Sequence, residues 1–218
     1  MSRAIQILAD YGYVARSRLR PLRYGMLPPP PNDGDRHPVL IIPGVFETWH
    51  YLRPVGERLA ALGHPVHYVA ALGFNHRPIA VTATMLQRYL RRKDLLNVTI
   101  VAHSKGGLIG KRMLVNDDRA DGRVRRLIAV NTPFSGTNVA RLGLGPWREF
   151  LPTNEIVAAL RGERAVNASI VSLYSTFDQY IPSGSFLEGA ENVVLPDIGH
   201  FGVLGRAHVV DEIASRVG

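Results

Sequence analysis

The chain has 218 residues, of which 46% are hydrophobic and 20% charged, so it suits a folded domain and is neither disordered nor collagen-like. It contains no cysteine, which excludes disulfide bonds, thiolate metal sites and a cysteine nucleophile, and no apolar run approaches the length of a membrane-spanning helix. Its 26 basic and 18 acidic residues give a formal net charge of +8, but the arginines accompany no zinc-finger or RNA-binding pattern, so charge alone does not indicate a nucleic-acid partner.

An amphipathic helix is predicted at the start of the chain, over residues 1 to about 24. Apolar side chains recur there at helical spacing, while Arg16, Arg20 and Arg23 lie largely on the other side. The apolar positions are Ala4, Ile5, Leu8, Tyr11, Ala15, Leu19 and Leu22. Two interpretations stay open: the helix packs on the main domain, or it lies on an anionic membrane surface with its arginines near the lipid head groups.

The same segment lacks the pattern of a signal peptide. Asp10 interrupts the apolar run, and the arginines follow that run instead of preceding it. We therefore expect a cytoplasmic protein, with peripheral membrane attachment through the helix as the alternative. Pro28 to Pro31 indicate a proline-rich linker, so residues 1–36 precede a main domain of residues 37–218.

Short β-branched runs alternate with helical patterns in the main domain. The expected strands cover residues 39–42, 66–70, 98–101, 127–131, 170–175 and 192–195. The expected helices cover residues 51–62, 79–92, 104–115 and 207–217. This alternation predicts an α/β fold with a mostly parallel central sheet of about six strands and helices on both faces. Residues 134–168 interrupt it with glycines and a short helical stretch near 154–161, which predicts a small lid-like insertion.

The segment Val98–Ile109 places one serine between a strand and a helix. Ala102-His103-Ser104-Lys105-Gly106 has small residues two positions before and two after Ser104, as a sharp turn with a projecting hydroxyl requires. The helix N-terminus beside the serine favours developing negative charge. The segment resembles the nucleophile elbow, G-x-S-x-G, of bacterial lipases and esterases in the α/β-hydrolase superfamily, with Ala102 in the first glycine position. The alternative is that Ser104 only caps a helix beside the sheet.

The resemblance implies the order serine, acid and histidine along the chain, with the acid and the histidine after later strands. Asp178 follows the strand expected at 170–175, and an apolar residue and a proline come soon after it. His200 follows a glycine after the last expected strand. The resemblance therefore implies a catalytic triad of Ser104, Asp178 and His200.

Other polar residues near these motifs are expected to have structural roles. Asp197 lies three residues before His200 and is expected to shape that loop, and Glu188 is the remaining candidate for the acid. His103 should point away from the serine and pack in the core. The Lys105 side chain is expected to be a solvated surface charge.

In the family, two backbone amides stabilise the tetrahedral oxyanion. The resemblance assigns one to Lys105, which follows the serine, and the other to the loop after the first strand. There Gly44 allows the backbone to approach the substrate, and the Val45 amide is the expected donor, with the Phe46 amide as the alternative. Residues 131–137 also resemble the lipase pattern T-P-x-x-G-T.

These resemblances imply hydrolysis of carboxylic esters through an acyl-enzyme, with no cofactor or metal. The expected partner is a small-molecule ester or lipid, and the candidates for binding it are Phe46, Trp147 and Phe150. The apolar residues of the insertion either line an acyl site or pack in the core; they are Leu142, Leu144, Trp147, Phe150 and Leu151. An acyltransferase or thioesterase stays open, because the same acyl-enzyme serves water, alcohol or thiol. A non-catalytic lipid-binding module is the remaining alternative.

Overall fold

Six parallel strands form the central sheet of the computed structural model, which describes residues 2–118 and 122–217. The strands are β1 Val39–Ile42, β2 Val66–Tyr68, β3 Val98–His103, β4 Val124–Val130, β5 Ile170–Phe177 and β6 Glu191–Ile198. Their order across the sheet is β2-β1-β3-β4-β5-β6, and every neighbouring pair is parallel. All six carboxyl ends therefore lie at one edge of the sheet, where α/β proteins place their sites. The fold predicted from the alternation is confirmed.

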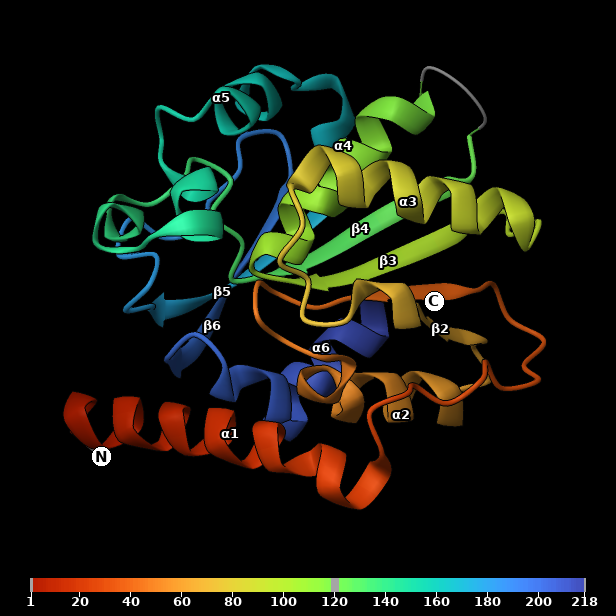
Figure 1. Cartoon of the computed structure of the whole chain (residues 1–218), viewed down its shortest axis with the longest axis horizontal. Coiled ribbons are helices and arrows are strands. Elements are labelled where there is room, and N and C mark those ends of the chain that lie inside the picture. The colour runs from red at the N-terminus through yellow and green to blue at the C-terminus, as the bar shows by residue number, and fades with distance from the viewer. Residues whose placement is uncertain (1, 119–121, 218) are drawn as a thin grey trace.

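Helices cover both faces of this sheet (Figure 1). One face carries α3 Ile79–Arg92, α4 Lys105–Asp118 and α5 Glu155–Gly162. The other side carries α1 Arg3–Tyr24, α2 Arg53–Ala61 and α6 Ala207–Val217. None of the helices in the described part of the chain is long and apolar enough to cross a membrane.

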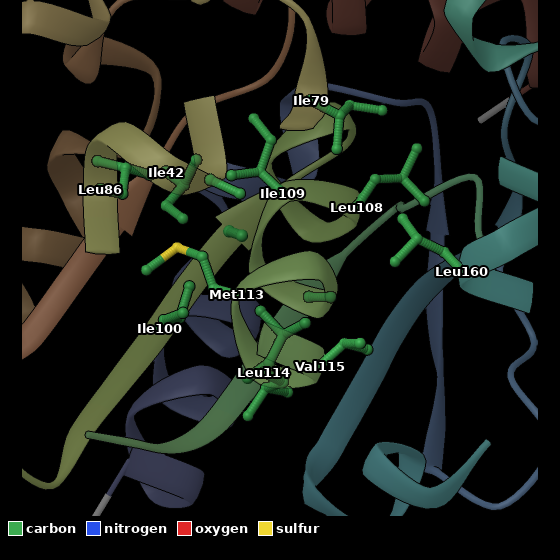
Figure 2. Close-up of a cluster of buried hydrophobic side chains, with 14 of the residues drawn as sticks. Ile42, Ile79, Leu86, Ile100, Leu108, Ile109, Met113, Leu114, Val115 and Leu160 are labelled. Carbon is green, nitrogen blue, oxygen red and sulfur yellow. The ribbon is translucent and has the colours of Figure 1, made fainter. Parts of the chain in front are cut away.

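Two hydrophobic clusters hold the layers together, one on each face of the sheet. In Figure 2, Ile42 and Ile100 point from the strands toward Leu86 of α3 and Met113 of α4. Alternate strand residues such as Ile41 face the other way, into the cluster under α2 and α6. Burial on both faces explains why the central strand β1 is apolar along its whole length, whereas the edge strand β6 is largely exposed or half-buried.

The element boundaries depart from the predicted ones where local chemistry intervenes. The helix expected at 51–62 is divided into a short 3₁₀ turn, η1 Trp49–Tyr51, and α2, because Pro54 lies in the first turn of α2. The strand expected at 66–70 ends at Tyr68, and a 3₁₀ turn, η2 Ala70–Leu72, follows it. Strands β3, β5 and β6 each run beyond their predicted carboxyl ends.

The insertion at 134–168 lies between β4 and β5 in the chain and contains little regular structure besides α5. Its 3₁₀ turns are η3 Asn138–Leu142, η4 Gly145–Phe150 and η5 Ala165–Ser169. Residue 1 of the predicted helix and residues 119–121 and 218 of the predicted main domain lie outside the described residues.

Helix α1 packs on the domain with a different face from the one its apolar periodicity suggests. Its buried side chains are Asp10, Tyr13 and Ser17, and the Tyr13 hydroxyl donates to the Tyr51 carbonyl oxygen at 2.7 Å. Most of the predicted apolar positions point outward instead; those with large exposed side chains are Ile5, Leu8, Leu19 and Leu22. Tyr11 is partly exposed, and its hydroxyl lies 3.4 Å from that of Tyr180. Polar contacts to the domain, rather than burial of the leucines, fix the orientation of this helix.

Candidate active site

Ser104 occupies the turn between β3 and α4 in a strained conformation. Its φ is 51°, in the left-handed region that non-glycine residues rarely adopt. Its amide donates to the Val130 carbonyl at 2.9 Å, and its carbonyl accepts from the Thr132 hydroxyl at 3.0 Å. A Cβ at Gly106 would lie 2.2 Å from the Ile42 carbonyl oxygen, so only glycine fits there. The surrounding backbone therefore holds the sharp turn that aims the Ser104 hydroxyl.

The structure brings Ser104, His200 and Asp178 into one hydrogen-bonded series. The Ser104 hydroxyl lies 3.0 Å from His200 Nε2, and His200 Nδ1 lies 2.6 Å from Asp178 Oδ2. The three residues directly follow or lie just beyond the carboxyl ends of β3, β6 and β5, which is why residues so distant in sequence meet. All three side chains are buried.

Asp178 is held as an anion that fixes the orientation of the imidazole. Burial alone would raise the pKa of Asp178, but the His200 ring and the amides of Tyr180 and Ile181 outweigh it and lower the pKa below its usual value. A carboxylate at Nδ1 keeps the proton on that nitrogen. The Nε2 lone pair of His200 then faces the Ser104 hydroxyl, as a base that accepts its proton must.

The two predicted oxyanion donors lie in neighbouring backbone segments. Lys105 is the first residue of α4, and Val45 lies in the loop after β1 and lines the same cavity as Ser104. The close approach of Gly106 to Ile42 packs these two segments against each other. Among the described residues, neither amide has a protein acceptor, so both are available to a ligand oxygen.

A second buried histidine–carboxylate pair, His103 with Glu47, supports the loop that carries His200. His103 Nδ1 lies 2.8 Å from Glu47 Oε1, and His103 Nε2 lies 2.9 Å from the His200 carbonyl oxygen. Glu47 Oε2 accepts from the Gly44 amide at 2.8 Å, and Asn131 Nδ2 donates to the same His200 carbonyl at 3.0 Å. This network joins the β1 loop, the end of β3 and the His200 loop. His103, predicted to pack in the core, is therefore a hydrogen-bonding residue as well.

His103 Nδ1 faces a carboxylate and Nε2 faces a carbonyl oxygen, so both ring nitrogens can donate when the ring is doubly protonated. Burial alone would lower the pKa of His103, but the Glu47 carboxylate and the His200 carbonyl oxygen outweigh it and raise the pKa. These contacts favour the protonated form of His103, whose ring centre lies 4.7 Å from that of His200.

Asp10 of α1 binds the loop that carries His200 and the loop that carries Asp178, a role that was not predicted from the sequence. Its Oδ1 accepts from the Phe201 amide at 2.8 Å and the Gly202 amide at 2.6 Å, directly after His200. Its Oδ2 accepts at 2.7 Å from the side chain of Gln179, the residue that follows Asp178. The only available signal was an acidic residue in an otherwise apolar and basic helix.

The prediction for the Lys105 side chain is wrong. The side chain is fully buried, and its Nζ donates to the carbonyl oxygens of Arg77 at 2.5 Å and Asn75 at 3.3 Å. Burial lowers the pKa of Lys105, and Glu149, whose carboxylate lies 3.5 Å away, opposes that shift in part. Lys105 therefore ties the start of α4 to the loop before α3 and to the insertion.

A cavity of about 390 Å³ opens at Ser104 and His200. Its other walls come from α1, the β1 loop, η1, the insertion and the loops after β5 and β6. The lining residues are Tyr11, Val14, Arg18, Val45, Phe46, Glu47, Tyr51, Trp147, Tyr180 and Phe201. Of the predicted substrate-binding residues, Phe46 and Trp147 line it, whereas Phe150 is buried in the core cluster. A second cavity of about 480 Å³ shares Arg18, Phe46 and Tyr51 with the first and extends the apolar surface.

The other candidate acids lie elsewhere. Asp197 Oδ2 lies 2.7 Å from His208 Nε2, and Glu188 pairs with Arg164 at the exposed surface. No group of three histidine, aspartate or glutamate side chains in the described residues is arranged to hold a metal ion.

Comparison with known proteins places this site in a fold with many solved examples. No protein-family model matches the chain. A haloalkane dehalogenase of Psychrobacter cryohalolentis is 28% identical over 188 residues, an alignment that covers 80% of this chain and 60% of the dehalogenase. The chain thus spans less than two thirds of the length of that relative.

Several lipases of known structure are similar in fold. Lipase B of Aspergillus fumigatus has a TM-score of 0.64 at 18% identity, covering 82% of this chain and 52% of the lipase. A Bacillus licheniformis lipase has a TM-score of 0.61 at 13% identity, covering 88% and 94%, and a Paleococcus ferrophilus monoacylglycerol lipase has 0.59 at 14%, covering 82% and 96%. The chain has the α/β-hydrolase fold that these enzymes share.

Proposed function

We propose that this chain, which has the α/β-hydrolase fold, is a serine hydrolase that cleaves carboxylic esters. The observation that carries the proposal is the buried hydrogen-bonded series from Ser104 through His200 to Asp178 at the wall of a cavity. The lipase structures with the same fold support the reaction class.

In the proposed mechanism, Ser104 Oγ attacks the ester carbonyl carbon while its proton passes to His200 Nε2. Asp178 stabilises the resulting imidazolium, and the amides of Val45 and Lys105 donate to the oxyanion. His200 then protonates the leaving alcohol as the ester C–O bond breaks, which leaves the acyl group on the serine. Water then gives a proton to His200 as its oxygen attacks the acyl carbon. His200 returns that proton to Ser104 Oγ as the acyl–serine bond breaks and the acid leaves.

The cavity walls favour an ester with an apolar acyl group. Phe46, Trp147 and Tyr180 line the space beside the serine, and the Trp147 and Tyr180 rings stack at 5.7 Å. The second cavity continues this surface beyond Phe46. We expect a Phe46→Ala variant to change the preference for acyl length across a series of p-nitrophenyl esters, because the substitution widens the junction between the two cavities.

The similarity to a dehalogenase does not change the proposal, because the nucleophile decides whether water can remove the covalent intermediate. Attack by a serine hydroxyl on an alkyl halide would leave an ether on the enzyme. A histidine-activated water does not cleave an ether, so the enzyme would stop after one event. Attack by Ser104 on an ester leaves an acyl group that water removes.

Turnover of p-nitrophenyl butyrate by purified protein tests the proposal. We expect Ser104→Ala to lower kcat by at least about 10³-fold, since it removes the nucleophile. Ser183→Ala, an exposed serine on the loop after Asp178, is the matched control and should keep full activity. Equal activity of Ser104→Ala and the original chain would contradict the proposal. A folded protein inactive on esters and thioesters would favour the lipid-binding module.

A further inference from the structure

Helix α1 has a face that the fold leaves uncovered. Its inner face is held by Asp10, Tyr13 and Ser17, and the helix contacts η1, β6 and the 3₁₀ turn η6 Gly202–Gly205. Figure 1 shows the helix along one edge of the molecule, with its other side facing outward. The inner contacts hold the helix in place without using its leucines.

The outward side carries a continuous apolar stripe, which we call the outer stripe. It consists of Ile5, Leu8, Leu19 and Leu22, and Tyr11 lies at its border with the cavity. Leu8 is 73% exposed, Leu19 62% and Leu22 86%. The spacings keep these side chains on one side of a helix of 22 residues, about 33 Å long. Large apolar side chains gathered in this way mark an interaction surface.

The exposed charged side chains of α1, beside the outer stripe, are all arginines. The helix contains five arginines and one acidic residue, Asp10, whose carboxylate is buried against the His200 loop. Arg3, Arg16, Arg18 and Arg23 are exposed. Leucines between arginines, with no exposed acid on the helix, match the chemistry of an anionic lipid surface.

The position of α1 beside the cavity adds a second argument. Tyr11, Val14 and Arg18 of this helix form part of the cavity wall that includes Ser104. The second cavity, which is also lined by α1, has the half-exposed apolar side chains Met26 and Phe74 at its rim. A lipid surface in contact with α1 would therefore lie beside the entrance to the proposed active site.

We infer that α1 docks the protein on anionic membranes, with the outer stripe in the head-group region and the helix parallel to the surface. This inference deepens the proposed function, since it makes esters held in a lipid surface the substrates. A second copy of the chain fits the stripe less well, because pairing two such helices brings arginines together without acids. Nucleic acid fits less well because it leaves the leucines without an apolar partner.

Flotation of the full-length chain with vesicles of phosphatidylcholine, with and without phosphatidylglycerol, tests the docking. We expect the chain to float with the anionic vesicles and far less with the neutral ones. Arg16→Gln with Arg23→Gln should weaken partitioning by about thirtyfold, or roughly fivefold per arginine. Leu8→Glu with Leu19→Glu should abolish flotation, because the substitutions remove buried apolar area and add carboxylates that anionic lipids repel.

Matched controls separate docking from general charge attraction. Arg88→Gln with Arg92→Gln removes two exposed arginines from α3, on the other side of the sheet, and should change partitioning by less than about threefold. Leu96→Glu places a charge at an exposed leucine outside α1 and should leave flotation intact. Equal losses in the α1 and α3 pairs would overturn the inference.

Other outcomes are equally decisive. Failure of the unmodified chain to float, or a dimer in size-exclusion chromatography that Leu19→Glu dissociates, would overturn the docking. Ser104→Ala should float like the original chain, so the docking and the proposed hydrolysis can fail separately. Leu8→Glu with Leu19→Glu should hydrolyse soluble p-nitrophenyl butyrate normally and lose only activity on vesicle-embedded esters.

Discussion

Two buried histidine–carboxylate pairs lie side by side in this molecule, His200 with Asp178 and His103 with Glu47. Their hydrogen bonds are similar in length, 2.6 Å and 2.8 Å, and their rings are neighbours. They differ in what the second ring nitrogen faces. His200 Nε2 faces the Ser104 hydroxyl, which has a proton to give, whereas His103 Nε2 faces a carbonyl oxygen, which does not.

This difference shows that a histidine beside a carboxylate is not in itself a base. With a hydroxyl as third partner, the ring has a free lone pair aimed at a proton donor. With a carbonyl as third partner, the ring donates from that nitrogen and has no lone pair aimed at a proton donor, so it joins two backbone segments instead of acting as a base. The first pair should therefore matter most for rate and the second for stability.

The largest expected effect comes from breaking the first pair. Asp178→Asn should lower kcat on p-nitrophenyl butyrate by about 10³- to 10⁴-fold, because the amide no longer fixes the imidazole tautomer. The matched control is Asp197→Asn, which affects an aspartate paired with His208 near the same loop and should change kcat by less than about threefold. If the two variants were reversed in effect, Asp197 would be the acid.

Breaking the second pair should change stability more than rate. Glu47→Gln leaves the buried His103 without its anionic partner and should lower the free energy of unfolding by about 3 kcal/mol. Glu57→Gln, which removes an exposed carboxylate paired with Arg53, should cost less than about 1 kcal/mol. Urea denaturation of the three proteins measures both. A Glu47→Gln protein of normal stability and abolished activity would place this pair in the chemistry.

Weakening the contact between α1 and the His200 loop should have a smaller effect on activity. Asp10→Asn weakens the hydrogen bonds to the Phe201 and Gly202 amides and should lower kcat by about tenfold with little change in KM, since the imidazole is less well positioned. Ser17→Ala alters another buried side chain on the same face of α1 and should have no such effect. A change in KM alone would instead point to substrate binding by α1.

The smallest expected effect is on the pH dependence of stability, which differs between the two histidine–carboxylate pairs. The pKa of His103 is raised above its ordinary value of 6.5, so its contribution is complete below that pH and is lost as the pH rises through the raised pKa. The pKa of Asp178 is lowered below 3.8, so its contribution is present above that pH and is lost as the pH falls through the lowered pKa. Glu47→Gln should therefore flatten the alkaline decline in urea unfolding, and Asp178→Asn should flatten the decline at acid pH.

Much of this architecture follows from local sequence patterns. A central strand such as β1 is apolar along its whole length because both of its faces are buried, and Ser104, Asp178 and His200 each come just after a strand of this sheet. Parallel strands bring such positions to one edge, which is why the three side chains that the family resemblance implied lie near one another.

The remaining features depend on contacts that no local pattern encodes. The burial of Lys105 depends on the carbonyl oxygens of Arg77 and Asn75, which a distant loop supplies. The orientation of α1 depends on Asp10, whose partners lie more than 160 residues further along the chain. Periodicity identified the apolar stripe of that helix but not the side that meets the domain.

Mass spectrometry of the protein after treatment with a fluorophosphonate tests the central claim most directly. If His200 makes the Ser104 hydroxyl nucleophilic, one phosphonyl group should be found on the peptide containing Ser104, and His200→Gln should prevent its formation. A folded protein that stays unlabelled, or an adduct at another residue that persists in His200→Gln, would contradict the account.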